Sequence, residues 1–390
     1  MKILLIPHYS FLNGSRIYLI QLLEYYYSKG YHIHLVLKRK QLDTEMKHIF
    51  LSYNIKTYSI FDAKLLQTIL GHKITLIFEN IIRFLYIMIY SLRIRPDVVV
   101  YSQNVGDIYR DILQLCFLKK FIYITHNYPR SNLHPLYKYF LNRRLGKKRI
   151  ILTVSRYAKN KIITFWTTAN TKKYVYYIYN YTEPKRIGLM NRLDTKYVLT
   201  LASVVDYKNP FLWIRVAELA KNNNIVFVWA GDGPFLEECR RMSKNISNNI
   251  QFIGYKNNVE ELYLKSIIYF QPSRIENHSM SVINAMSYGL PCIVSNVGGL
   301  TECVKDGVNG FVVELDDARM MAEKIEMLIN DRNLRIKMGE ESKKIAMKKF
   351  AKAIWTRKNN YMYEYILCKK TFRKGHRQIK DKIKAGLRPE

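Results

Sequence analysis

The chain has 390 residues, of which 48% are apolar, and this content excludes an intrinsically disordered protein. Its length exceeds what one hydrophobic core normally supports, so we expect about two domains. The formal net charge of +32 predicts an anionic partner, such as a lipid surface, a nucleic acid or an acidic polymer.

The first half of the chain has the pattern of an α/β unit. A strand at 2–7, a loop containing Gly14, an apolar-periodic helix from about 16 to 28 and a strand at 32–37 form one strand–helix–strand repeat. No charged leader, apolar core or cleavage site precedes the first strand, so we expect a cytoplasmic protein. Five widely spaced cysteines lack metal or redox spacing, and we expect them to be reduced.

The same pattern restarts in the second half of the chain. A strand at 197–203, a helix from about 210 to 221 and a strand at 225–230 repeat the order of the first half. Residues 181–195, which include a proline, a glycine and several charges, separate the two halves. The sequence therefore predicts two similar, doubly wound sheets.

The most informative segment, residues 272–302, follows a short apolar strand. Glu276 lies in the loop beyond the strand's carboxyl end, where open α/β sheets bind ligands. Ser279 can cap the helix that follows, and the N–H groups at Met280 and Ser281 then favour a phosphate. The segment predicts an anion-binding site with a carboxylate beside it.

This segment resembles the C-terminal half of the family 4 (group 1) retaining glycosyltransferases, in which a Glu is followed by seven residues and a second Glu. Gly231 and Gly233, in AGDGP, resemble the family's glycine-rich turn, and Lys208, in SVVDYKNP, stands where the family has a phosphate-binding lysine. The resemblance spans roughly residues 2–365. Weaker similarities in the first half are Gly14, Pro96, Asp97, His126 and the TVS at 153–155.

Several positions depart from the family pattern. Asn284 stands at the second acidic position, Ser203 stands where many members carry an arginine, and Gly14 and Ser15 replace a Gly-Gly pair. Asparagine still donates and accepts hydrogen bonds, but it lacks the charge that strengthens them. Two interpretations stay open: an enzyme with Lys208 as the main side-chain cation on the diphosphate, and a non-catalytic subunit that stabilises or targets an active transferase.

The resemblance implies the GT-B fold, in which two Rossmann-like doubly wound domains face a cleft and a C-terminal helix crosses back to the first domain. The expected parts are an acceptor-side domain at 1–185, a nucleotide-sugar-binding domain at 190–342, a crossover helix at 343–370 and a basic tail at 371–390.

The resemblance also implies transfer of a hexose or related sugar with retention of configuration. Because the sequence shows no acidic metal-binding cluster, we expect this transfer to be metal-independent. The implied donor is a nucleoside diphosphate sugar, with UDP expected rather than GDP. The basic charge of the first domain leads us to expect a lipid-linked saccharide as the acceptor, in bacterial surface polysaccharide biosynthesis, such as capsule or lipopolysaccharide. No cofactor and no metal site are expected. The implied catalytic-site residues are Glu276 and His126, the donor-binding residues are Lys208, Gly231, Gly233, Ser279, Met280, Ser281, Asn284 and Ser203, and the acceptor and phosphate loop contains Gly14 and Ser15.

The positive charge is unevenly placed. Residues 1–190 contain 30 Lys and Arg against 9 Asp and Glu, residues 191–342 contain 17 against 19, and residues 343–390 contain 16 against 3. A basic first domain favours peripheral binding to an anionic membrane on the inner face of the cell. The near-neutral second domain and the lack of a recognition motif argue against a nucleic-acid partner.

Residues 74–94 predict an amphipathic helix, with Glu79, Arg83, Tyr86 and Tyr90 on one stripe against apolar residues. Its longest run without charge is nine residues, whereas roughly 20 are needed to span a bilayer. Two interpretations stay open: a helix that lies on a membrane, and a helix that packs on the first sheet.

Overall fold

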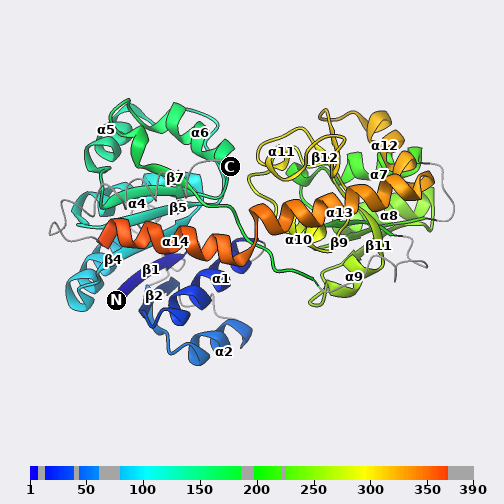
Figure 1. Cartoon of the computed structure of the whole chain (residues 1–390). Coiled ribbons are helices and arrows are strands. Elements are labelled where there is room, and N and C mark those ends of the chain that lie inside the picture. Colours follow the sequence, from blue (N-terminus) through cyan, green and yellow to red (C-terminus); the bar gives the residue numbers. More distant parts are fainter. Residues whose placement is uncertain (8–13, 39–43, 61–79, 186–196, 221–224, 368–390) are drawn as a thin grey trace, which may run out of the picture. The chain divides into compact units, whose positions relative to one another are not determined.

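The computed structural model describes residues 1–7, 14–38, 44–60, 80–185, 197–220 and 225–367 (Figure 1). The chain forms two compact units, one of Met1–Ile178 with Thr356–Glu390 and one of Tyr179–Trp355. Residues 186–195 of the predicted linker at 181–195, and the predicted basic tail at 371–390, lie outside the described residues.

The first unit contains a seven-stranded parallel sheet in the order β3-β2-β1-β4-β5-β6-β7. Every residue of β4 and β5 is buried, as expected for parallel strands that helices cover on both faces. The strands are β1 (Lys2–Pro7), β2 (His32–Lys38), β3 (Lys56–Ile60), β4 (Val98–Gln103), β5 (Phe121–Thr125), β6 (Arg149–Thr153) and β7 (Val175–Tyr177). The helices are α1 (Gly14–Ser28), α2 (Thr44–Ser52), a helix at 80–94, α4 (Ile108–Phe117), α5 (Pro135–Arg144) and α6 (Arg156–Trp166), with short 3₁₀ turns at Val105–Asp107 and Lys172–Tyr174.

The second unit contains a six-stranded parallel sheet in the order β10-β9-β8-β11-β12-β13. Its strands are β8 (Tyr197–Leu201), β9 (Val226–Ala230), β10 (Ile250–Gly254), β11 (Ser266–Gln271), β12 (Cys292–Ser295) and β13 (Gly310–Val313). Its helices are the 3₁₀ turn η4 (Asp206–Lys208), α7 (Pro210–Leu219), α8 (Leu236–Ile246), α9 (Glu260–Leu264), α10 (Met280–Ser287), α11 (Leu300–Cys303), α12 (Ala318–Asn330) and α13 (Arg332–Lys349).

Alternation along the strands of the second unit builds a core on each face of its sheet. Val198 joins the cluster beneath α7, α8 and α12, whereas the next residue, Leu199, joins the cluster beneath α10, α11 and α13. The predicted pair of doubly wound sheets is therefore confirmed, with strand boundaries close to those expected.

The chain leaves the second unit through α14 (Lys352–Leu367), so the segment predicted as one crossover helix, 343–370, contains the end of α13 and all of α14. The division between the units falls within α14, at Trp355. In the first unit, the buried Tyr363 of α14 hydrogen-bonds the buried Tyr26 of α1, and the Tyr25 hydroxyl donates to Asn360 Oδ1 at 3.0 Å. The C-terminal half of α14 is thereby fixed to α1.

Both sheets contain a point where the strand order reverses. In the first unit it lies between β1 and β4, and in the second unit it lies between β8 and β11. Loops that follow the two strands at such a point diverge and leave room for a ligand. The topology therefore selects the loops after β8 and β11 as a place to search for a site.

Candidate functional site

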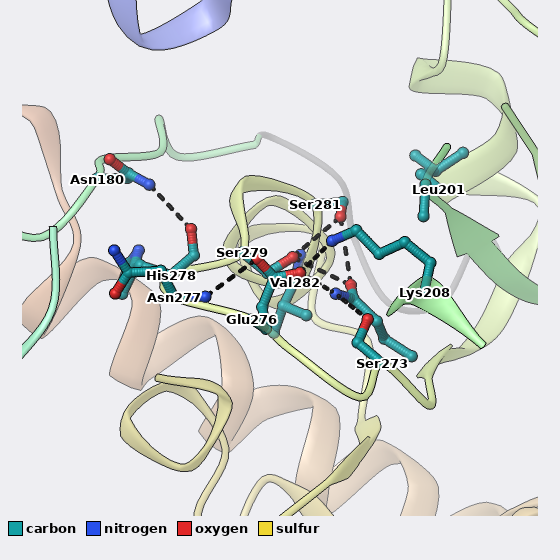
Figure 2. Close-up of polar contacts among 12 residues, drawn as sticks. Asn180, Leu201, Lys208, Ser273, Glu276, Asn277, His278, Ser279, Ser281 and Val282 are labelled. Carbon is teal, nitrogen blue, oxygen red and sulfur yellow. Dashed lines mark hydrogen bonds and ion pairs between the residues drawn. The ribbon is translucent and has the colours of Figure 1, made fainter. Parts of the chain in front are cut away.

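Two charged side chains meet at the reversal point of the second unit. Lys208 ends the 3₁₀ turn η4 after β8, and Glu276 lies in the loop after β11. Lys208 Nζ forms an ion pair with Glu276 Oε2 (Figure 2), and the two side chains are only 15% and 13% exposed. The structure thus brings together two predicted site residues that lie far apart in the sequence.

The carboxylate of Glu276 is held by further contacts. Gln271 Nε2 donates to Glu276 Oε2 at 2.7 Å, and the Asn277 backbone N–H donates to Glu276 Oε1 at 3.3 Å. The backbone carbonyl of Glu276 accepts from the N–H of Gly299, in the glycine pair that follows β12. These contacts fix the carboxylate between adjacent loops at one edge of the sheet.

Gln271, the last residue of β11, connects the carboxylate to the start of α10. Its side-chain oxygen accepts from the hydroxyls of Tyr269, Ser279 and Ser281 at 3.2, 3.0 and 3.4 Å, while its nitrogen donates to Glu276 and to Ser273 Oγ. The sequence analysis missed this residue. The signal in the sequence was a polar glutamine at the last position of a buried strand, directly before the loop.

The start of α10 has the expected cap. The Ser279 side chain accepts from the Val282 backbone N–H, as predicted for the residue that begins this helix. The N–H groups of Met280 and Ser281, in the first turn, have no acceptor from an earlier turn, and the helix dipole is positive here. The helix start therefore offers an anion both N–H donors and positive potential.

The predicted glycine turn packs the loop after β9 against the loop after β8. A Cβ at Gly231, whose φ is +156°, would lie 1.9 Å from the Ala202 carbonyl oxygen, and one at Gly233 would lie 2.3 Å from that of Val204. Ser203, a predicted donor-binding residue, lies between Ala202 and Val204 in the sequence, and its role in donor binding stays a prediction. Only glycine allows this close approach, so the turn has a structural role whether or not a ligand contacts it.

Arg274 is a second cation that the sequence analysis missed. It lies two residues before Glu276, and its Nη1 lies 2.9 Å from Asp206 Oδ1 at the start of η4. Its backbone N–H also donates to the Tyr207 carbonyl at 2.9 Å. Arg274 therefore ties the loop that carries Glu276 to the turn that carries Lys208.

Asn284 lies in the second turn of α10. Its side-chain oxygen accepts a hydrogen bond from the Thr182 hydroxyl at 2.7 Å. The position where the related family has its second Glu thus contacts the first segment of the second unit. Its predicted role in donor binding stays a prediction.

His278 lies next to Asn277 but points away from the Lys208–Glu276 pair (Figure 2). Its ring is buried, stacks on Tyr179 with centroids 4.9 Å apart, and meets the Phe350 ring edge-on at 5.0 Å. Burial lowers the pKa of His278 to about 3. A neutral, enclosed ring of this kind packs the core, so we exclude it from the catalytic residues.

The predicted residues of the first half all belong to the first unit. His126 follows β5, and its Nε2 lies 2.8 Å from the Ser102 hydroxyl of β4, with the Tyr18 ring edge-on at 4.8 Å. Gly14 and Ser15 begin α1 after β1, and their side chains lie outside the description. These residues thus follow strands at or beside the reversal point of the first sheet.

In the described part of the chain, no group of three or more His, Cys, Asp and Glu side chains could hold a metal ion. The described cysteines, Cys116, Cys239, Cys292 and Cys303, are free thiols, and Cys368 lies outside the described residues.

Sequence comparisons identify a family match and related proteins. The model of the family "Glycosyl transferases group 1" matches residues 183–345. The chain is 29% identical over 136 residues to the Escherichia coli UDP-Gal:alpha-D-GlcNAc-diphosphoundecaprenol alpha-1,3-galactosyltransferase, a match that covers 33% of this chain and 35% of that protein. The chain therefore aligns with about a third of the length of this curated relative.

Solved structures show likeness over nearly the whole chain. A glycosyltransferase from Rickettsia africae superposes with a TM-score of 0.78 at 18% identity, covering 95% of this chain and 99% of the other. Anabaena Alr3699/HepE, solved in complex with UDP, superposes with a TM-score of 0.72 at 15% identity, covering 93% and 100%. At these identities the likeness concerns the fold, and the expected GT-B fold is confirmed.

Proposed function

Because residues 183–345 match the group 1 glycosyl transferases and the chain has their GT-B fold, we propose that it transfers a sugar from a nucleoside diphosphate sugar to a saccharide acceptor. We propose UDP as the nucleotide of the donor and retention of configuration at the transferred carbon. UDP occurs in the names of the E. coli relative and of the Anabaena complex, and the α linkage in the relative's name matches retention from an α-linked donor.

The observation that carries this proposal is the Lys208–Glu276 pair beside the start of α10. As the sugar's C1–O bond breaks, its electron pair passes to the diphosphate oxygen. The acceptor hydroxyl oxygen forms the new bond to C1, and its proton passes to the leaving diphosphate. Lys208 and the first turn of α10 would stabilise the charge on the leaving diphosphate. Glu276, released from Lys208, would accept hydrogen bonds from hydroxyls of the donor sugar.

We also propose that transfer needs no divalent metal. Lys208 and the N–H groups of α10 supply positive potential to the diphosphate, and Arg274 lies in the adjoining loop. His126 would border the acceptor in the first unit.

We propose a lipid-linked saccharide as the acceptor, in the synthesis of a bacterial surface polysaccharide at the cytoplasmic side of the membrane. The E. coli relative's name states an acceptor on diphosphoundecaprenol. The basic first half of this chain suits an anionic membrane surface.

Calorimetric titration with UDP and with GDP tests the donor site. We expect wild-type protein to bind UDP in the micromolar range and Lys208→Ala to weaken binding by about tenfold or more, because a charge-assisted contact to the diphosphate is lost. Glu276→Gln should impair sugar transfer more than UDP binding. Lys256→Ala, which removes an exposed lysine elsewhere in the second unit, is the matched control and should bind like wild type.

The non-catalytic interpretation makes the opposite prediction. Asn284 favours this interpretation, because the position carries no acidic group and the side-chain oxygen already accepts a hydrogen bond from Thr182. If folded wild-type protein bound neither UDP nor GDP, the donor-site proposal would fail, and a subunit that supports an active transferase would be the better description.

A further inference from the structure

The helix at 80–94 in the first unit buries its polar stripe, together with Ile87 and Ile94, and leaves a second, apolar stripe exposed. Arg83 is 4% exposed, and Tyr86 and Tyr90 pack against the core of the unit. Arg83 Nη2 lies 3.0 Å from Oδ1 of Asp111, a fully buried residue of α4, and Asp111 Oδ2 accepts from the Tyr123 hydroxyl at 3.1 Å. Because separating a buried ion pair is costly, this contact determines which side of the helix faces the sheet.

The apolar side of the same helix consequently faces outward. Ile81, Leu85, Ile89 and Leu92 are 51, 50, 56 and 71% exposed, and their spacing of four, four and three residues places them on one stripe. Phe117, at the end of α4, extends this stripe, because it is 61% exposed and its ring lies 5.6 Å from that of Phe84. A large exposed patch of this kind marks an interaction site.

We define the apolar face as Ile81, Leu85, Ile89, Leu92 and Phe117. Basic residues adjoin it in the sequence: the exposed Arg93 and Arg95 at the helix end, and Lys119 and Lys120 directly after α4. An apolar stripe with a basic rim has the chemistry of a segment that lies in the headgroup region of an anionic bilayer. A second copy of the chain is a poorer occupant, since it would present the same positive charge.

We propose that the apolar face docks the chain on an anionic phospholipid bilayer, with its side chains inserted among the lipid headgroups. No helix among the described residues is long and apolar enough to cross a membrane, so docking would be on the surface. This inference rests on the proposed function, because docking at a bilayer would bring the chain to a lipid-linked acceptor. The docking itself is argued from the exposed side chains and the charge.

Co-sedimentation of the full chain with vesicles tests the proposal. The vesicles are phosphatidylcholine with or without phosphatidylglycerol, at physiological salt. We expect wild-type protein to bind the anionic vesicles, and Leu85→Ser/Ile89→Ser to bind roughly tenfold or more weakly, because two apolar side chains no longer leave water. The control Met320→Ser/Met327→Ser replaces two similarly exposed residues of α12 in the second unit, and it should bind like wild type.

Three outcomes would overturn the inference. If wild-type protein stays in the supernatant, the chain has no such docking surface. If the apolar-face variant binds the anionic vesicles as strongly as wild type, charge alone attaches the chain to the bilayer. A variant that changes only the oligomeric mass in light scattering shows that a second copy covers the face. UDP titration of the same samples separates the two proposals: vesicle binding without UDP binding refutes the donor site alone, and the reverse refutes the docking alone.

Discussion

At the scale of single residues, Gln271 organises the candidate site. It contacts Glu276 on one side and the capping serine of α10 on the other. We predict that Gln271→Leu lowers UDP affinity by about tenfold, because the carboxylate and the serine hydroxyls lose their common partner. Calorimetry measures the affinity, with Gln251→Leu on β10 as the control. A variant that melts earlier but binds UDP normally would show that Gln271 only stabilises the unit.

His278 makes stability depend on pH. Its pKa is about 3 in the folded chain, against an ordinary value of 6.5, so between these values the unfolded state binds a proton that the folded state does not. The free energy of unfolding therefore decreases as pH falls through this window, by up to about 1.4 kcal/mol per pH unit.

We predict that His278→Phe, which keeps an aromatic ring between Tyr179 and Phe350, reduces this dependence. Thermal unfolding measured from pH 7 down to about pH 5 checks it. An equal loss of stability with falling pH in wild type and variant would refute the assignment.

At the scale of elements, the turn after β9 illustrates how the backbone positions the site. We predict that Gly231→Ala lowers the free energy of unfolding by about 2–4 kcal/mol, since the new Cβ meets the Ala202 carbonyl and the φ is unfavourable. Gly307→Ala is the control, because Gly307 also has a positive φ but open space around it. Urea titration compares them, and equal effects of the two substitutions would mean that close packing contributes nothing.

The helix at 80–94 shows the limit of sequence patterns for an element. The spacing of its residues indicates an amphipathic helix, but this pattern does not decide which of the two sides faces the sheet. In most such helices the apolar side faces the core. Asp111 pairs with the buried Arg83, and Tyr123 is in turn the hydrogen-bond partner of Asp111, so the polar stripe faces the sheet. Neither partner lies within the helix, so its own pattern did not predict the orientation. Glu79 and the predicted first residues, 74–79, lie outside the description.

At the scale of the whole molecule, two units of the same architecture carry very different charge. Residues 1–178 and 356–390 contain 39 Lys and Arg against 11 Asp and Glu, whereas residues 179–355 contain 24 against 20. The second unit contains the Lys208–Glu276 pair, and the first contains the apolar face. This separation matches the proposed tasks, since one unit would bind a small anionic donor and the other would meet a membrane surface.

The sequence by itself determined the two doubly wound units, their approximate strand boundaries and the loops that carry Lys208 and Glu276. These features depend on local apolar periodicity, on turn residues and on a family pattern, all of which are visible along the chain. Tertiary structure decided which side chains meet: the ion pair of Lys208 and Glu276, the linking role of Gln271, the enclosure of His278 and the outward side of the helix at 80–94. Each of these contacts joins residues from different elements, which the order of the parallel strands and the packing of the core bring together. The spacing of residues within one segment does not predict such contacts.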